Sequence, residues 1–187
     1  MTQKSTMMTT ENTLDSTSEP SKKVRKTRRP RKKASPAATK KLPSNPFMNE
    51  IFELVSEQKT DDGKIAILKE YECDILKSLF IWNFDDSVIS LLPQGTVPYK
   101  PNENPLGTDH SSLRREQRSL YNFVKGGNDQ LSTIRRETIF IQMLEGLHPK
   151  EADIIIAVKD RDLEDMYDVS FEVVEEAYPD IEWGGRS

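Results

Sequence analysis

Residues 45–55 read Asn-Pro-Phe-Met-Asn-Glu-Ile-Phe-Glu-Leu-Val, and this stretch decides the fold class. Phe47, Ile51, Leu54 and Val55 fall at positions i, i+4, i+7 and i+8, which places four apolar side chains on one face of a helix. The asparagine and proline at the start suit a helix cap and a first helical position. Order is therefore expected to begin at residues 45 and 46, in a helix.

The same period recurs to the end of the chain and predicts an all-α body of six to eight short helices, with no confident strand. Further helices are expected to start at Asp61 or Asp62, Asp74, Ser111 or Ser112, Ser132 or Thr133, Pro149 and Ser170, with short turns from Asp85 and at Leu163. The residues expected to face the core include Ile65, Leu68, Tyr71, Ile75, Leu76, Leu79, Phe80, Trp82, Val88, Ile89, Leu92, Leu113, Leu120, Phe123, Val124, Ile134, Phe140, Ile141, Leu144, Ala152, Ile155, Ile156, Leu163, Met166, Tyr167, Phe171, Val174 and Tyr178.

Residues 93–109 interrupt the helical pattern. They contain four prolines and two glycines, which forbid a continuous helix and favour an extended crossing over the surface. Tyr99 and Leu106 are candidates to anchor this crossing on the body. Trp183, close to the end of the chain, is expected to dock on the body as well.

Residues 1–45 have the composition of a disordered tail, so the body is assigned to residues 46–187. The tail carries a basic arm at 22–41 with eleven cations and no acidic residue, namely Lys22, Lys23, Arg25, Lys26, Arg28, Arg29, Arg31, Lys32, Lys33, Lys40 and Lys41. Residues 1–41 hold 12 Lys or Arg and 3 Asp or Glu, a net charge of +9, whereas residues 42–187 hold 15 and 28, a net charge of −13. A mobile cationic arm on an anionic body favours a polyanionic partner.

The arm is suited to sequence-independent binding of nucleic acid, most simply DNA. If about five of its charges touch phosphates, affinity falls roughly 10²–10³-fold between 50 and 200 mM salt. The run Arg28-Arg-Pro-Arg-Lys-Lys33 resembles an AT-hook, but Arg29 stands where that motif has glycine. The arm has no aromatic residue, so stacking on single strands is not its mode. A targeting signal, an acidic protein partner or a merely solvated tail are the alternatives.

An arginine cluster in the central helices offers a second contact with phosphate through Arg114, Arg115 and Arg118. Since Arg114 and Arg118 are one turn apart, an α-helix would place them on one face. Arg135 and Arg136 belong to the same cluster. The competing interpretation is that these arginines form ion pairs with nearby carboxylates, of which Glu116 and Glu137 are adjacent in sequence.

Catalytic machinery is not apparent, and we expect neither an enzyme nor a cofactor. His110 and His148 stand beside expected helix starts and are interpreted as surface or capping residues. The lone Cys73 is interpreted as a small buried residue. The acidic run from Asp160 fails the calcium-loop pattern, because it has Asp165 at the sixth position, so no metal site is predicted. No apolar stretch is long enough to span a membrane, so a soluble protein of the cytoplasm is expected.

Six strings prompt a comparison with a known group of proteins. They are KIAILKEY at 64–71, LLPQGTVPY at 91–99, NENPLGT at 102–108, LYNFVKGG at 120–127, FIQMLEG at 140–146 and AYPDIEW at 177–183. Through them the chain resembles, over about two-thirds of its length, an uncharacterised family of small proteins encoded by large tailed phages, notably those of marine cyanobacteria. The resemblance implies a phage protein in the host cytoplasm, and no reaction or catalytic residue.

Together these features predict a phage-encoded accessory protein without enzymatic activity. Its helical body would bind an unidentified protein partner, and its tail would add attachment to DNA by raising the effective concentration. The alternative is a structural or assembly protein of the virion, which contacts capsid or portal subunits or the packaged DNA.

Overall fold

The computed structural model of the protein describes residues 41–105, 108 and 110–185, all within one compact unit. The described part of the chain contains eight α-helices, one 3₁₀-helix and no strand. This confirms the all-α prediction. The elements are α1 (Met48–Ser56), α2 (Asp61–Glu70), α3 (Asp74–Phe84), α4 (Leu113–Glu116), η1 (Gln117–Phe123, the 3₁₀-helix), α5 (Thr133–Gly146), α6 (Pro149–Asp160), α7 (Leu163–Tyr167) and α8 (Phe171–Ala177).

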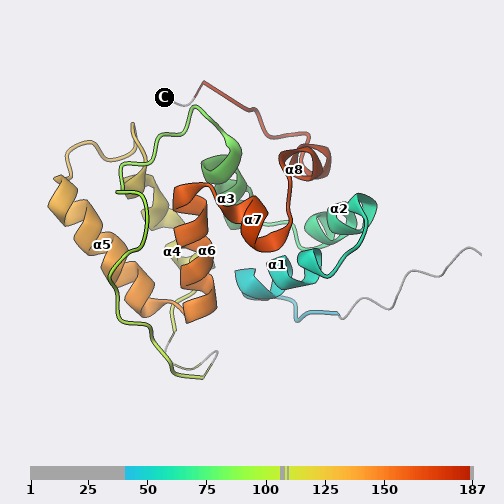
Figure 1. Cartoon of the computed structure of the whole chain (residues 1–187), viewed down its shortest axis with the longest axis horizontal. Helices are drawn as coiled ribbons and strands as arrows, with labels where there is room; N and C mark the ends of the chain where they lie inside the picture. The colour runs from blue at the N-terminus through green and yellow to red at the C-terminus, as the bar shows by residue number, and fades with distance from the viewer. Residues whose placement is uncertain (1–40, 106–107, 109, 186–187) are drawn as a thin grey trace, which may run out of the picture. The chain divides into compact units, whose positions relative to one another are not determined.

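Helix α6 is the centre of the packing, since it contacts α1, α3, α5 and α7 (Figure 1). Ala152, Ile154, Ile155 and Val158 are all fully buried on it. Helices α2 and α8 pack against each other on the α1 side, and η1 packs against α5 on the other side. One continuous apolar core therefore joins all the helices around α6.

Helix α1 begins two residues later than predicted, at Met48 rather than Pro46. The reason is a contact from a distant helix: the buried carboxylate of Glu151 in α6 accepts the backbone N–H of Met48 at 2.9 Å. Phe47 stays extended, with ψ of 155°, and its N–H donates to Glu50 at 2.9 Å. The first turn of α1 is thus fixed by tertiary packing as well as by its own sequence.

The crossing predicted at 93–109 is confirmed for its described residues, which form neither helix nor strand. In Figure 1 this segment, coloured green, runs alongside α5. Lys159, whose side chain is almost fully buried, donates to the carbonyl oxygens of Pro93 at 2.9 Å and Gly95 at 3.1 Å. Tyr99 is half-buried against the core, as expected, whereas Leu106 lies outside the described residues.

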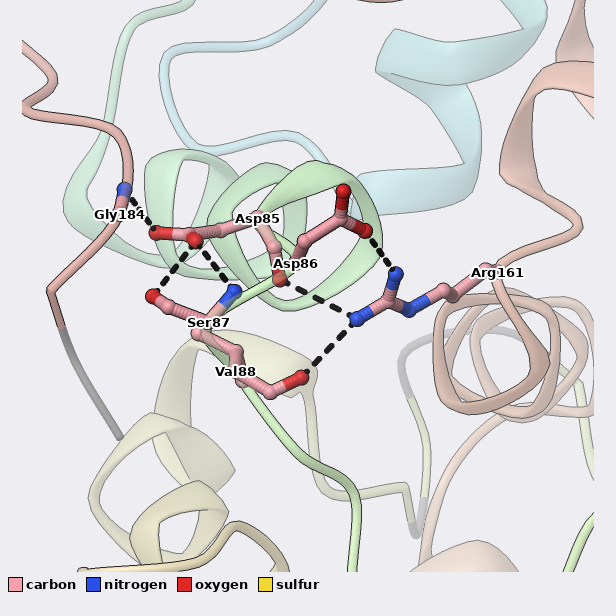
Figure 2. A network of polar contacts seen from close by, with 6 residues as sticks. All are labelled: Asp85, Asp86, Ser87, Val88, Arg161 and Gly184. Atoms are coloured by element: carbon pink, nitrogen blue, oxygen red, sulfur yellow. Dashed lines mark hydrogen bonds and ion pairs between the residues drawn. The ribbon is translucent and has the colours of Figure 1, made fainter.

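A polar network joins the turn after α3 to the end of α6 and to the C-terminal segment (Figure 2). Arg161 ends α6 in a left-handed conformation, with φ of 68°. Its guanidinium donates to the Asp86 carboxylate at 2.5 Å and to the carbonyls of Asp85 at 3.2 Å and Val88 at 3.1 Å. The buried Asp85 carboxylate accepts the N–H of Gly184 at 3.0 Å. This network fixes the position of Val88.

Several apolar residues that were expected in the core are exposed. Ile89 is 43 % exposed, Met166 47 % and Ile134 79 %. Ile134 is the second residue of α5 and lies on the opposite side of its first turn from the buried Arg136. Cys73 is half-buried rather than buried, because it is the residue immediately before α3. Trp183 docks as predicted, with its ring 5.0 Å from that of Phe171.

Candidate nucleic-acid interface

Most of the predicted basic arm cannot be placed, because residues 22–40 lie outside the described part of the chain. Of its eleven cations only Lys41 is described, and it is exposed. The structure therefore bears on the second predicted contact, the arginines that follow Ser112. We call residues 113–136, from the start of α4 to the first turn of α5, the basic segment.

The basic segment differs in charge from the rest of the body. It holds six Lys or Arg and two Asp or Glu, a net charge of +4. The other residues from 42 onward hold nine Lys or Arg and 26 Asp or Glu, a net charge of −17. Four of the six cations are exposed, namely Arg115, Arg118, Lys125 and Arg135. The basic segment is thus a net positive stretch of an acidic body, and most of its cations are in contact with solvent.

The predicted ion pairs of these arginines are wrong for the residues that the structure describes. The Glu116 carboxylate accepts hydrogen bonds from the hydroxyls of Ser111 at 2.6 Å and Ser119 at 3.4 Å, and no arginine pairs with it. Glu137 pairs with none either. All six ion pairs found among the described residues involve other cations. The exposed cations of the basic segment are therefore left to solvent or to a ligand.

Two of the six cations have structural contacts. Arg136 is 5 % exposed and donates to the carbonyls of Asn122 at 2.7 Å and Asn128 at 3.0 Å, which ties α5 to the end of η1. Arg114 is half-buried and donates from Nε to the carbonyl of Pro46 at 3.3 Å. Only the remaining four are available to bind phosphates.

The predicted pairing of Arg114 and Arg118 on one face does not occur. After one turn of α4 the backbone tightens into η1, a 3₁₀-helix of seven residues, which is long for this kind of helix. Arg114 and Arg115 line one cavity of about 210 Å³ beside His110. Arg118 lines another of about 650 Å³ beside α3. The change from 3.6 to three residues per turn separates the two arginines.

The turn that follows η1 depends on two glycines. Gly126 has φ of 81°, a conformation that favours glycine. At Gly127 an added Cβ would come within 1.9 Å of the carbonyl oxygen of Tyr121. The loop after η1 therefore folds back directly on the backbone of η1.

Glu151 holds the basic segment to the rest of the body. Its carboxylate is fully buried and accepts the N–H of Met48 at 2.9 Å and that of Leu113 at 3.0 Å, which are the first residues of α1 and α4. Burial raises the pKa of this carboxyl, and the two N–H donors and the nearby Arg114 act in the opposite direction. One side chain of α6 thus fixes two helix starts.

His148 has the capping role that was predicted, whereas His110 is half-buried and does not cap α4, whose N-cap is Ser112. His148 precedes α6, and its Nδ1 accepts the N–H of Lys150 at 3.3 Å. His110 lies edge-on to His148, with ring centroids 5.2 Å apart, and its Nε2 contacts the carbonyl of Asn104 at 2.8 Å. No group of three or more His, Cys, Asp or Glu side chains in the described residues is arranged to hold a metal ion. None of the described helices has the length and apolar composition needed to cross a bilayer.

The sequence did not single out Tyr121 or Lys125, which lie beside Arg118 around the larger cavity. Tyr121 is 53 % exposed. In an α-helix Tyr121 and Arg118, three residues apart, would be neighbours but would stand about 60° apart around the axis. The 3₁₀ period brings the two residues into line.

Comparison with known families places the chain. Residues 51–165, more than half of it, match a family of unknown function (DUF6433), and the protein belongs to this family. No curated protein and no solved structure matches the chain.

Proposed function

We propose that this member of the family is a phage-encoded accessory protein that binds DNA without reading its sequence. In this proposal the basic arm and the exposed cations of the basic segment contact phosphates together. The protein acts by attachment and carries out no reaction. The phage origin rests on the resemblance of the six sequence strings to proteins of large tailed phages.

One observation carries the proposal: Arg115, Arg118, Lys125 and Arg135 have no carboxylate partner among the described residues, in a body that is otherwise strongly acidic. An exposed guanidinium or ammonium group near so many carboxylates would gain from pairing with one. Where the cations are left unpaired, they are free to neutralise phosphates and release condensed counterions.

The acidic remainder of the body determines the side from which DNA would approach. A net charge of −17 outside the basic segment repels a polyanion, so DNA is expected to approach the body only from the basic segment. The arm, with its net charge of +9 in residues 1–41, adds affinity at any orientation that its length allows. Attachment by both parts raises the effective concentration of each at the DNA.

Salt-dependent binding of a DNA duplex tests both parts. A chain that lacks residues 1–40 keeps Leu42, whose N–H donates to the Tyr71 hydroxyl at 3.1 Å. For this shortened chain, the slope of log K against log salt is expected to be shallower than that of the full chain by about 4.5, if five arm charges contact phosphates. A deletion that leaves affinity and slope unchanged would show that the arm has no such role.

The body's contribution is tested by the triple variant Arg115→Gln/Arg118→Gln/Lys125→Gln. Its slope is expected to become shallower by up to about 2.7, since each phosphate contact contributes about 0.9. The matched control is Lys59→Gln/Lys69→Gln/Lys100→Gln, which removes three exposed cations outside the basic segment. Equal losses in the two variants would mean that only net charge matters, and the proposed contact would be wrong.

A further inference from the structure

The cavity of about 650 Å³ between α3 and η1 has the size of ligand pockets in proteins. Ile81, Trp82 and Val88 line it from the α3 side, and Leu120 and Val124 line it from the side of η1. The polar residues of the lining are Asp74, Ser78, Gln117, Arg118, Tyr121 and Lys125. The lining thus combines apolar walls on both sides with polar side chains, and Asp74 is the one carboxylate in it.

The 3₁₀ geometry of η1 aligns two side chains along this cavity. Residues three apart in a 3₁₀-helix lie one above the other. Arg118 and Tyr121 follow that spacing, and both line the cavity together with Val124, the extended residue that ends η1. Lys125 lines it beyond them. An exposed aromatic ring is therefore flanked along the chain by two cations that lack a carboxylate partner.

Trp82 adds a hydrogen-bond donor without a partner. The residue is 4 % exposed and lines the cavity, and its indole Nε1 is buried with no hydrogen-bond acceptor in the described part of the chain. A buried donor in this condition is costly, and such groups are rare in folded proteins. A small shift of the lining that admits an acceptor atom would satisfy it.

The position of the cavity is fixed by structural contacts on both sides. Val88 is held by the Arg161 network of Figure 2, and η1 is held by the buried Arg136. The lining is therefore pre-formed, which lowers the cost of binding a ligand.

We propose that this cavity takes one unstacked base of a single-stranded nucleic acid, an inference that rests on the function proposed above and makes it specific. The base stacks on Tyr121 between apolar walls, and a carbonyl oxygen or ring nitrogen of the base accepts from the indole of Trp82. Arg118 and Lys125 bind the phosphates on either side of that base. Recognition of an unpaired base by aromatic stacking is a general mode of single-strand binding.

This arrangement favours nucleic acid over an acidic peptide. A nucleotide chain supplies an anionic group on each side of every base, which matches a ring with a cation before and after it. A peptide would need an acidic residue on each side of an apolar one. The arm, which has no aromatic residue, gives no preference for single strands, so any such preference belongs to the cavity.

The chain provides its own reporter for the test. It contains two tryptophans, so the variant Trp183→Phe in the full-length chain leaves Trp82 as the only one. The probes are an oligothymidylate and a DNA duplex of the same strand length. We expect the oligothymidylate to quench or shift Trp82 fluorescence, and the duplex to bind without this change.

Tyr121 supplies the matched variants. Tyr121→Ala is expected to weaken binding of the oligothymidylate about tenfold, while Tyr121→Phe keeps the ring and binds within about twofold of the parent. Duplex binding is expected to be the same in both. Met166→Ala, which removes another half-exposed apolar side chain, is the control and leaves both affinities unchanged.

The outcomes separate this inference from the proposed function. If both probes bind but Trp82 does not respond and Tyr121→Ala has no effect, the cavity is not a base site and the attachment function stands. If neither probe binds, both proposals are wrong. A Trp82 response to a peptide of alternating Glu and Leu, with none to the oligothymidylate, overturns the inference in favour of a protein ligand.

Discussion

The cations of the body fall into two groups, those that form ion pairs and those that do not. Around α2, α3, α6 and α7, five cations pair with carboxylates, namely Lys64, Lys77, Lys150, Lys159 and Arg161. In the basic segment none of the six forms such a pair among the described residues, although 28 acidic residues follow Leu42. Cations in the packed helices thus form ion pairs, whereas cations without a carboxylate partner are concentrated in the basic segment.

The two regions meet at Glu151, and its removal is expected to have the largest effect. Glu151→Ala leaves the N–H groups of Met48 and Leu113 buried without an acceptor. At about 1–3 kcal/mol for each, the free energy of unfolding should fall by about 2–6 kcal/mol, measured by urea denaturation. The exposed Glu175→Ala is the control and should stay within about 0.5 kcal/mol. A small effect of Glu151→Ala would mean that the starts of α1 and α4 do not depend on the Glu151 carboxylate.

Arg135 and Arg136, which are adjacent in α5, allow an exposed cation and a structural cation to be compared within one turn. Arg136→Met removes two charge-assisted hydrogen bonds to backbone carbonyls and should lower the free energy of unfolding by about 2–3 kcal/mol. Arg135→Met should leave stability unchanged within about 0.5 kcal/mol and make the salt dependence of DNA binding shallower by about 0.9. Urea denaturation and a salt titration of binding separate the two roles. Loss of stability in Arg135→Met would contradict the distinction.

Much of the body follows from its sequence, and α6 and the crossing at 93–105 show why. Pro149 and the apolar residues after it fix α6 locally, and the prolines of the crossing exclude a helix whatever surrounds them. The start of α1 and the 3₁₀ geometry of η1 could not be predicted in this way. The start of α1 depends on Glu151, which lies about a hundred residues from the Met48 N–H that it binds. Arg136 binds the end of η1 from about fourteen residues away.

The site was less predictable than the fold. The positions of Arg114, Arg115 and Arg118 were apparent, but their partners were not, because pairing depends on which carboxylates fold nearby. Glu116 is adjacent in sequence, yet its oxygens accept from Ser111 and Ser119 instead. Tyr121 went unnoticed because its exposure and its place beside the cavity depend on how η1 packs, which the sequence does not show.

Protonation of His148, the residue that caps α6, is expected to have a smaller effect on stability. Burial, then the nearby His110 and Lys150, hold the pKa of His148 below its ordinary value of 6.5, while Asp153 and Glu53 act in the opposite direction. Because the folded pKa is depressed, this contribution to stability is complete above pH 6.5 and is lost as pH falls through the folded pKa. Protonation of Nδ1 also removes the acceptor for Lys150.

His148→Asn tests this contribution, because asparagine caps helices and does not titrate. The variant should match the parent at neutral pH and lose less stability, by up to about 1 kcal/mol, on acidification to about pH 5. Urea denaturation at the two pH values measures the difference. Parallel losses in variant and parent would show that His148 does not titrate in this way.

The smallest effect is expected for a paired cation. The Nζ of Lys77 lies 2.5 Å from Oε1 of Glu72 and 2.7 Å from Oδ2 of Asp180, and both carboxylates are well exposed. Lys77→Gln should change the free energy of unfolding by less than about 1 kcal/mol and leave the salt slope of DNA binding unchanged. A slope change as large as that of Arg118→Gln would remove the contrast between paired and unpaired cations.

Chemical-shift mapping by NMR tests the contact between the basic segment and DNA most directly. A short duplex is titrated into the ¹⁵N-labelled full-length chain at low salt, and the shifts of the backbone amides are followed. The account predicts that, within the body, the largest changes fall on residues 115–125 and around Arg135. Binding that leaves these amides unmoved, or that moves chiefly the amides of α2 and α8, would contradict it.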